Sequence, residues 1–109
     1  MSTRRSSRAA APLFAALGDK TRLQLVSRLS ADGPMSIAKL TSGAKVTRQA
    51  ITKHLRVMAE AGLMHSKRYG RESVWQLDTA RLQDARRYLK LISKQWDDAL
   101  ARLREFVER

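Results

Sequence analysis

The sequence predicts a mainly α-helical domain that carries one small β-hairpin. Three observations lead to this fold class. Apolar residues recur at three-to-four spacing through most of the chain, as they do along one face of a helix. Short segments with strand-favouring side chains occur only between residues 63 and 77, on either side of Gly70. Residues 80–108 contain no Gly or Pro and form the longest helical pattern.

Charge indicates the kind of partner. The 109 residues suit one domain and include 22 Lys and Arg against 10 Asp and Glu, so the net charge is +12. Such an excess favours a polyanion partner, either a nucleic acid or an anionic membrane. Residues 1–77 carry 14 basic and 4 acidic side chains, whereas residues 78–109 carry 8 and 6. The polyanion should therefore contact the first two thirds of the chain.

Two absences narrow the function classes further. No apolar run approaches the roughly 18 residues that a membrane span needs, so we expect no membrane partner. The chain has no cysteine, which excludes disulfides and thiolate metal sites and fits a cytoplasmic protein. No Gly-rich phosphate loop and no His beside a suitable carboxylate or serine can be recognised, so we do not expect an enzyme.

The N-terminal segment, MSTRRSSRAAA, is rich in Arg and Ser and has no acid. We predict that residues 1–11 form a flexible basic arm, in which Arg4, Arg5 and Arg8 could add contacts to the polyanion; the sequence leaves open whether they do. A transit peptide has the same composition and is the alternative. Pro12 fits the first turn of a helix, where its missing N–H costs nothing, and Gly18 ends that helix.

Three further helices follow with recognisable ends. Asp19 caps a helix that runs to about residue 31, and the run Asp32-Gly33-Pro34 predicts a turn. Ser36 is the expected N-cap of a third, short helix. Thr47 is the expected N-cap of a fourth helix that runs to about Ala61 before Gly62. The outer face of this fourth helix carries polar residues, namely Arg48, Gln49, Thr52, Lys53 and Arg56.

Residues 63–68 and 73–77 predict the two strands of the hairpin, with Gly70 in its turn. Two strands would be marginal alone, so the hairpin should pack on the helices. In the last helix, apolar residues recur every seven positions in two series, as in a dimerising helix. A 29-residue helix is roughly 43 Å long, more than this domain can cover, so part of it should meet a second copy. The interface residues that we expect there are Leu82, Leu89, Ile92, Trp96, Leu103 and Phe106.

A short helix, a turn and a helix with a polar outer face form a helix-turn-helix pattern. The DNA major groove admits one helix, and base edges offer donors and acceptors to Arg, Gln, Thr and Lys. The first two turns of the fourth helix usually enter the groove, and here they carry Arg48, Gln49, Thr52 and Lys53. Lys67, Arg68 and Arg71 lie on the hairpin, where they could reach phosphates or the minor groove. Each of these residues alone also fits a solvated surface; together, and in this order of elements, they favour DNA.

At residues 12–108 the chain resembles the ArsR/SmtB-type winged-helix regulators. The matching stretches are LFAALGDKTRLQLVSRL and TRQAITKHLRVMAEAGLMHSKRYGRESVWQL. The resemblance implies five helices with a winged hairpin between the last two, and a homodimer joined through the first and last helices. It thus adds Leu13 and Phe14 to the dimer interface. It divides the chain into a DNA-binding region, 12–79, and a dimerisation helix, 80–109.

The resemblance also implies an inverted-repeat operator, usually bound by a repressor, and it assigns residues to DNA contact. Carried over one by one, these are Thr47, Arg48, Gln49, Thr52 and Lys53, with Arg68 and Arg71 in the wing. Ser36 would begin the helix that touches the DNA backbone. The sequence therefore predicts a homodimeric repressor that occludes a promoter. A non-specific architectural DNA-binding protein is the alternative, and a protein-interaction module is a third class. The inducer, a small molecule or a protein, stays open.

The chain departs from the metal-sensing members of that family. Many of them use a Cys-Val-Cys run, and the matching positions here are Ser36, Ile37 and Ala38. A second family site uses His and carboxylates on the last helix, which has acids here but no His. The only histidines are His54, expected to be packed and hydrogen-bonded, and His65. We therefore expect no metal and no other cofactor.

Overall fold

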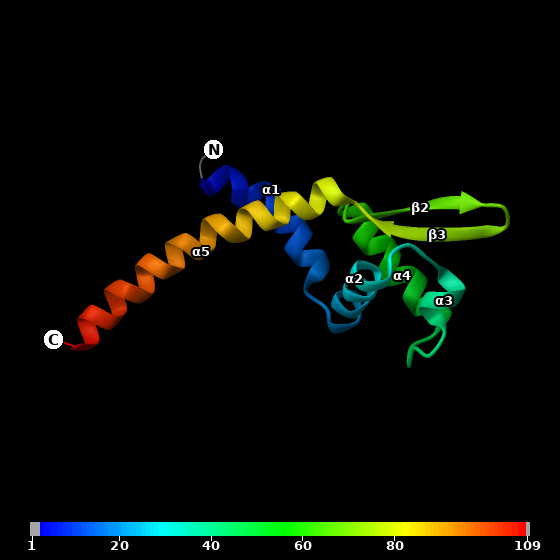
Figure 1. Ribbon diagram of the computed structural model, residues 1–109, viewed down its shortest axis with the longest axis horizontal. Helices are drawn as coiled ribbons and strands as arrows, with labels where there is room; N and C mark the ends of the chain where they lie inside the picture. Colours follow the sequence, from blue (N-terminus) through cyan, green and yellow to red (C-terminus); the bar gives the residue numbers. More distant parts are fainter. Residues whose placement is uncertain (1–2, 109) are drawn as a thin grey trace.

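The computed structural model describes the backbone of residues 3–108 and the side chains of residues 10–108. The elements in order are α1 Thr3–Leu17, α2 Lys20–Asp32, β1 Met35–Ser36, α3 Ile37–Thr41, α4 Arg48–Glu60, β2 Met64–Tyr69, β3 Glu72–Leu77 and α5 Thr79–Glu108. The chain is elongated, with extents of 64 × 31 × 21 Å. The β2–β3 hairpin and the C-terminal end of α5 lie at opposite ends of the long axis (Figure 1).

Helix α1 is longer than the sequence predicted. It begins at Thr3, so residues 3–11, which we expected to form a flexible arm, are helical, and Pro12 lies inside the helix instead of in its first turn. An internal proline removes one backbone hydrogen bond, but the alanines before it favour the helix and Ala10 is buried against the domain. Residues 1 and 2 and the side chains of Arg4, Arg5 and Arg8 lie outside the described part, so their contact with DNA stays a prediction.

The three predicted N-caps are confirmed. The Asp19 carboxylate accepts the Arg22 N–H at 3.0 Å, and the Ser36 hydroxyl accepts the Lys39 N–H at 3.2 Å. The Thr47 hydroxyl accepts the Ala50 N–H at 3.1 Å, so that α4 begins at the next residue. Each cap satisfies a backbone donor that the first turn of a helix leaves without a partner.

The predicted stop of α4 is confirmed as well. Gly62 has φ +81°, a conformation that residues with a Cβ rarely adopt. Its N–H donates to the Ala59 carbonyl at 2.9 Å, and the Leu63 N–H donates to the Met58 carbonyl at 3.0 Å. This pair of bonds is a Schellman motif, with Leu63 and Met58 both buried beside it. The motif turns the chain from α4 directly into β2.

The predicted hairpin is confirmed as β2 and β3, and a third strand, β1, which the sequence did not predict, extends it to a three-stranded sheet. All pairs are antiparallel in the order β1-β3-β2, with Met35 opposite Trp75 in the short third strand. Two residues are too few to show the alternation by which a strand is recognised in a sequence. The added strand ties the hairpin to the segment that leads into α3.

One hydrophobic core joins the helices and the base of the sheet. Its fully buried members include Leu13, Leu40, Ile51, Leu55, Met58, Leu63 and Met64. Leu13, which we expected at the dimer interface, is 0 % exposed because α1 packs into the domain, and that expectation was wrong. Leu82 is half-buried against the same core, so it also serves the protomer.

Candidate nucleic-acid interface

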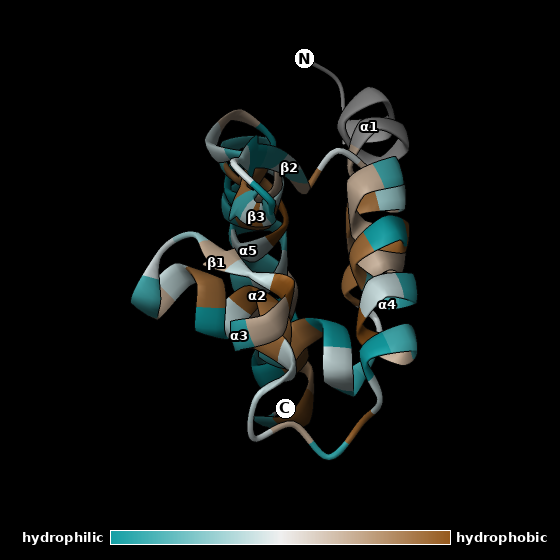
Figure 2. Ribbon diagram, turned by 90° about the vertical axis from the view of Figure 1, so that its right-hand side faces the viewer, coloured by the Kyte–Doolittle hydropathy of each residue, from teal (hydrophilic) through white to brown (hydrophobic). Residues whose placement is uncertain are grey.

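The outer face of α4 is polar and open to solvent. Its inner face buries Ile51, Leu55 and Met58, which fixes the orientation of the helix on the core. Figure 2 shows the resulting division, with hydrophilic residues on the outer side of the α4 ribbon and hydrophobic residues on the inner side. The outer side chains line one shared hollow of about 520 Å³, formed by Arg48, Gln49, Thr52, Lys53 and Arg56.

The structure thus gathers four of the predicted base-contacting residues on one surface and adds Arg56 to them. We assigned Arg56 to the outer face but not to the DNA contacts, because it lies beyond the first two turns of α4. Its position eight residues after Arg48, just over two helical turns, puts it on the same side of the helix. The spacing alone could have identified it.

Thr47, the N-cap of α4, and Thr52, on its outer face, differ in which side-chain groups remain available for DNA. The Thr47 oxygen accepts the Ala50 N–H, which leaves its hydroxyl proton to donate to a phosphate. The Thr52 hydroxyl donates to the Arg48 carbonyl at 2.9 Å, so its oxygen and its methyl group remain for contact with a base. Thr47 therefore suits the DNA backbone, and Thr52 suits a base edge.

The β2–β3 hairpin forms a wing that carries cations on both faces and at its tip. Tyr69 pairs with Glu72 across a two-residue turn, in which Gly70 has φ +61° and Arg71 occupies the second central position. Successive side chains of a strand point to opposite faces, so Lys67 and Arg68 project in opposite directions. The Arg68 Nε also donates to the Gly70 carbonyl at 3.3 Å, which holds this guanidinium near the tip.

The predicted contact at the start of α3 has a simple geometry. Ser36 lies at the end of β1 and is half-buried, and its hydroxyl oxygen accepts the cap bond, which leaves the hydroxyl proton to donate. Lys39, one turn further, is exposed and provides a charge on the same short helix. Ser36 thus acts here as the residue that begins α3.

A polar cluster anchors α4 to the α1–α2 connection. The Arg22 side chain donates to the Ala16 carbonyl through Nε and lies 3.3 Å from the His54 Nδ1 through Nη1. Because a guanidinium only donates, His54 Nδ1 is the acceptor in this contact. Asp19 lies 3.9 Å from the same nitrogen, and the N–H of Arg22 is the main cause that lowers the pKa of its carboxyl group. His54 is therefore a packed, hydrogen-bonded residue, as the sequence predicted.

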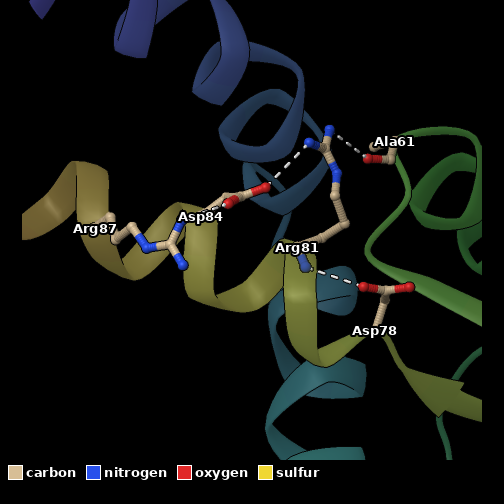
Figure 3. A network of polar contacts seen from close by, with 5 residues as sticks. All are labelled: Ala61, Asp78, Arg81, Asp84 and Arg87. Atoms are coloured by element: carbon tan, nitrogen blue, oxygen red, sulfur yellow. Dashed lines mark hydrogen bonds and ion pairs between the residues drawn. The ribbon is translucent and has the colours of Figure 1, made fainter. Parts of the chain in front are cut away.

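A second polar cluster joins the start of α5 to the end of α4 (Figure 3). The Asp78 carboxylate accepts the Arg81 N–H at 3.0 Å and begins α5. The Arg81 Nη2 then donates to the Ala61 carbonyl at 3.3 Å, and its Nη1 lies 3.5 Å from Asp84. The sequence reasoning missed this contact because it joins residues twenty positions apart. It connects the end of α4 to the long helix α5.

The described residues contain no group of three His, Cys, Asp or Glu side chains close enough to hold a metal ion. No helix in the same part of the chain is long and apolar enough to cross a membrane.

Comparison with known proteins identifies the family. A family model described as a helix-turn-helix domain matches residues 17–67. The HTH-type transcriptional regulator Rv2034 of Mycobacterium tuberculosis is 34 % identical over 108 residues, which cover 99 % of this chain and 94 % of that protein. An ArsR-like transcriptional regulator from Rhodococcus sp. RHA1 superposes with a TM-score of 0.72 at 34 % identity, over 91 % of this chain and 92 % of its own.

A third similar protein shows the fold alone. It is a Mycobacterium bovis fragment described as a homodimeric winged helix-turn-helix DNA-binding domain, 20 % identical with a TM-score of 0.63. The match covers 90 % of this chain and 89 % of the fragment. In helix-turn-helix regulators the second helix of the motif lies in the major groove of DNA. Together these findings show that the chain belongs to the ArsR family of winged helix-turn-helix transcriptional regulators, which are not enzymes.

Proposed function

We propose that this protein is a homodimeric, sequence-specific repressor that occludes a promoter by binding an inverted-repeat operator. The single observation that carries the proposal is the exposed face of α4, where Gln49 and Thr52 lie among the cations. A purely electrostatic contact would use cations alone, because only they attract phosphates at a distance. Arg forms paired hydrogen bonds with guanine and Gln forms them with adenine, so this mixture suits base recognition.

The C-terminal half of α5 supports the homodimer. It extends beyond the rest of the protomer (Figure 1), and its large apolar side chains stay exposed, from 58 % for Trp96 to 78 % for Val107. An apolar groove of about 470 Å³ lies between α1 and α5, where Phe14 packs against Tyr88 with ring centroids 5.6 Å apart. Exposed apolar patches of this kind mark interaction surfaces.

A second copy is the partner that the spacing favours. Leu89, Trp96 and Leu103 recur every seven residues, which is the repeat of helices that pair along their length. We propose that Phe14, Leu89, Ile92, Trp96, Leu103 and Phe106 form this interface. A two-fold dimer would place two α4 helices on half-sites whose centres lie about one helical turn of DNA apart, or a multiple of it.

We propose that DNA binding is independent of metal ions. At the positions of the family's cysteine ligands the chain has Ser36, Ile37 and Ala38, and none of them is a metal-binding side chain. Stoichiometric Zn²⁺ should therefore leave the DNA affinity of the purified protein unchanged. A many-fold change would contradict this part of the proposal.

A non-specific architectural role is the second candidate, and the charge of residues 1–77 is the observation that favours it. Selection of random duplexes by the purified protein distinguishes the two. We expect enrichment of an inverted repeat, with Gln49→Ala losing the preference at one position of each half-site. Arg71→Ala should weaken binding to every duplex alike and reduce the salt dependence. Selection without an enriched motif would support the architectural role instead.

A further inference from the structure

A pocket of about 590 Å³ lies beside the helix-turn-helix, and its lining shares no residue with the polar hollow of α4 or with the apolar groove of α5. Its walls come from α2, from the end of α3 and from the turn of residues 42–46 that leads to α4. We call it the α2–turn pocket. Its volume falls in the range of about 300–1,000 Å³ that is typical of small-molecule sites.

The floor of the α2–turn pocket is apolar. Leu25 of α2, Leu40 of α3 and Ile51 of α4 form it, and all three side chains are buried in the core. Val46, half-buried, closes the side next to α4. Three different helices therefore meet at one hydrophobic surface, against which the apolar body of a ligand could pack.

The rim of the pocket is cationic. Lys20, Arg28 and Lys45 belong to the lining, and the lining contains no acidic residue. The Arg28 Nη1 donates to the Leu40 carbonyl at 3.1 Å, so the guanidinium is held at the mouth by the fold itself. Only one of its five N–H groups is needed for that bond, and a carboxylate can accept two others in parallel.

From this combination we propose that the α2–turn pocket binds a small organic carboxylate with an aromatic or aliphatic body. The carboxylate would pair with Arg28 and with Lys45, and the apolar part would lie on Leu25, Leu40 and Ile51. An inorganic anion would leave the apolar floor unused. A neutral apolar molecule would leave the three cations uncompensated. The two halves of the lining together specify an amphipathic anion.

Such a ligand would regulate DNA binding, an inference that rests on the proposed function. The lining joins both helices of the helix-turn-helix, and Val46 directly precedes Thr47, the N-cap of α4. A bound carboxylate neutralises cations near the start of the helix that faces the phosphates, and it fixes one geometry of the turn. Both effects should weaken DNA binding, and by linkage DNA should weaken ligand binding by the same factor.

The first test maps binding on the full chain without DNA. Amide chemical shifts are followed during titration with benzoate, 4-phenylbutyrate and octanoate, with their neutral amides and inorganic phosphate as controls. We expect at least one carboxylate to give saturable shifts at Leu40, Gly43 and Ala44, whereas its amide and phosphate do not. Lys45→Gln, which breaks no contact of the fold described above, should weaken that binding at least several-fold, and Arg28→Met should abolish it. Lys90→Gln, a matched charge loss on α5, should not change it.

Three outcomes would overturn the proposal. The first is that none of the three carboxylates gives a saturable shift. The second is that phosphate binds equally well, which would make the rim a contact for the DNA backbone. The third is that carboxylate binding is unchanged in Lys45→Gln and Arg28→Met. A second test measures DNA affinity with the bound carboxylate at saturation, where a weakening of at least several-fold is expected. Carboxylate binding without any effect on DNA would retain the site and reject its regulatory role. Because the first test contains no DNA, failure of the repressor proposal cannot mimic failure of the pocket.

Discussion

Gly62→Ala tests whether the junction between α4 and α5 is built as described. Gly62 has φ +81°, and a Cβ placed there would lie 3.0 Å from the Nε of Arg81. An alanine must therefore adopt a strained backbone, and it also pushes by a few tenths of an ångström on the Arg81 side chain that donates to the Ala61 carbonyl. Gly43 provides a matched control, because it has φ +76° and a Cβ there would meet nothing within 4 Å.

The losses in the free energy of unfolding caused by the two substitutions should differ only through the contact with Arg81. The left-handed conformation costs a residue with a Cβ about 1–2 kcal/mol. The smaller freedom of alanine in the unfolded chain offsets about 0.4–1 kcal/mol of that. Gly43→Ala should thus lower the free energy of unfolding by about 1 kcal/mol. Gly62→Ala should lower it by about 2 kcal/mol, because it also loses a hydrogen bond worth about 0.5–1.5 kcal/mol.

Urea unfolding at one fixed protein concentration measures both values, since a dimer's stability depends on concentration. In an Arg81→Ala background the excess should vanish, so that Gly62→Ala costs only as much as Gly43→Ala. Equal effects of the two glycine substitutions in the original chain would refute the reasoning. An excess that persists without Arg81 would show that the strain lies in the backbone alone.

Four further predictions concern a cap, a core residue, the dimer interface and a titration. Thr47→Ala should cost about 1 kcal/mol of stability in urea unfolding and Thr47→Ser much less, and equal losses would contradict the cap role. Leu13→Ala should cost about 2–5 kcal/mol, whereas Trp96→Ala should mainly convert the dimer to a monomer in light scattering. A dimer that survives Trp96→Ala would contradict the interface. Since the folded state lowers the pKa of Asp19 below 3.8, its stabilisation should be complete above that value and decline as the pH falls. Asp19→Asn should flatten this acid limb of the stability profile, and an unchanged limb would exclude Asp19 as a cause.

The capped ends of the helices could be predicted because capping is local. Asp19 and Thr47 satisfy donors three residues away, and Gly62 supplies a conformation that its own backbone requires. The absence of Gly and Pro from residues 80–108 likewise predicted the extent of the long helix to within a residue of Thr79–Glu108. These features depend on a few consecutive residues, which the sequence displays directly.

Other features depend on contacts between distant residues, and the sequence did not reveal them. The spacing of apolar residues around Leu13 is the same whether this side chain faces its own core or a second copy. Only the packing of α1 decides which of the two it contacts. The strand Met35–Ser36 exists because Trp75 and Val74 lie beside it. The Arg81 contact with Ala61 and the α2–turn pocket both arise where separate elements meet. The polar face of α4 was predictable as a set, since one helix presents all of its members.

The most direct test of the central claim compares DNA affinities by fluorescence anisotropy. One duplex comes from the region upstream of the protein's own gene and one is its scrambled counterpart, and each is titrated at two salt concentrations. Recognition through α4 predicts a preference of about 10³ or more for the upstream duplex that persists at the higher salt concentration, where non-specific binding has fallen steeply. Equal affinities with the same steep salt dependence, together with no motif in the selection experiment, would contradict sequence-specific recognition.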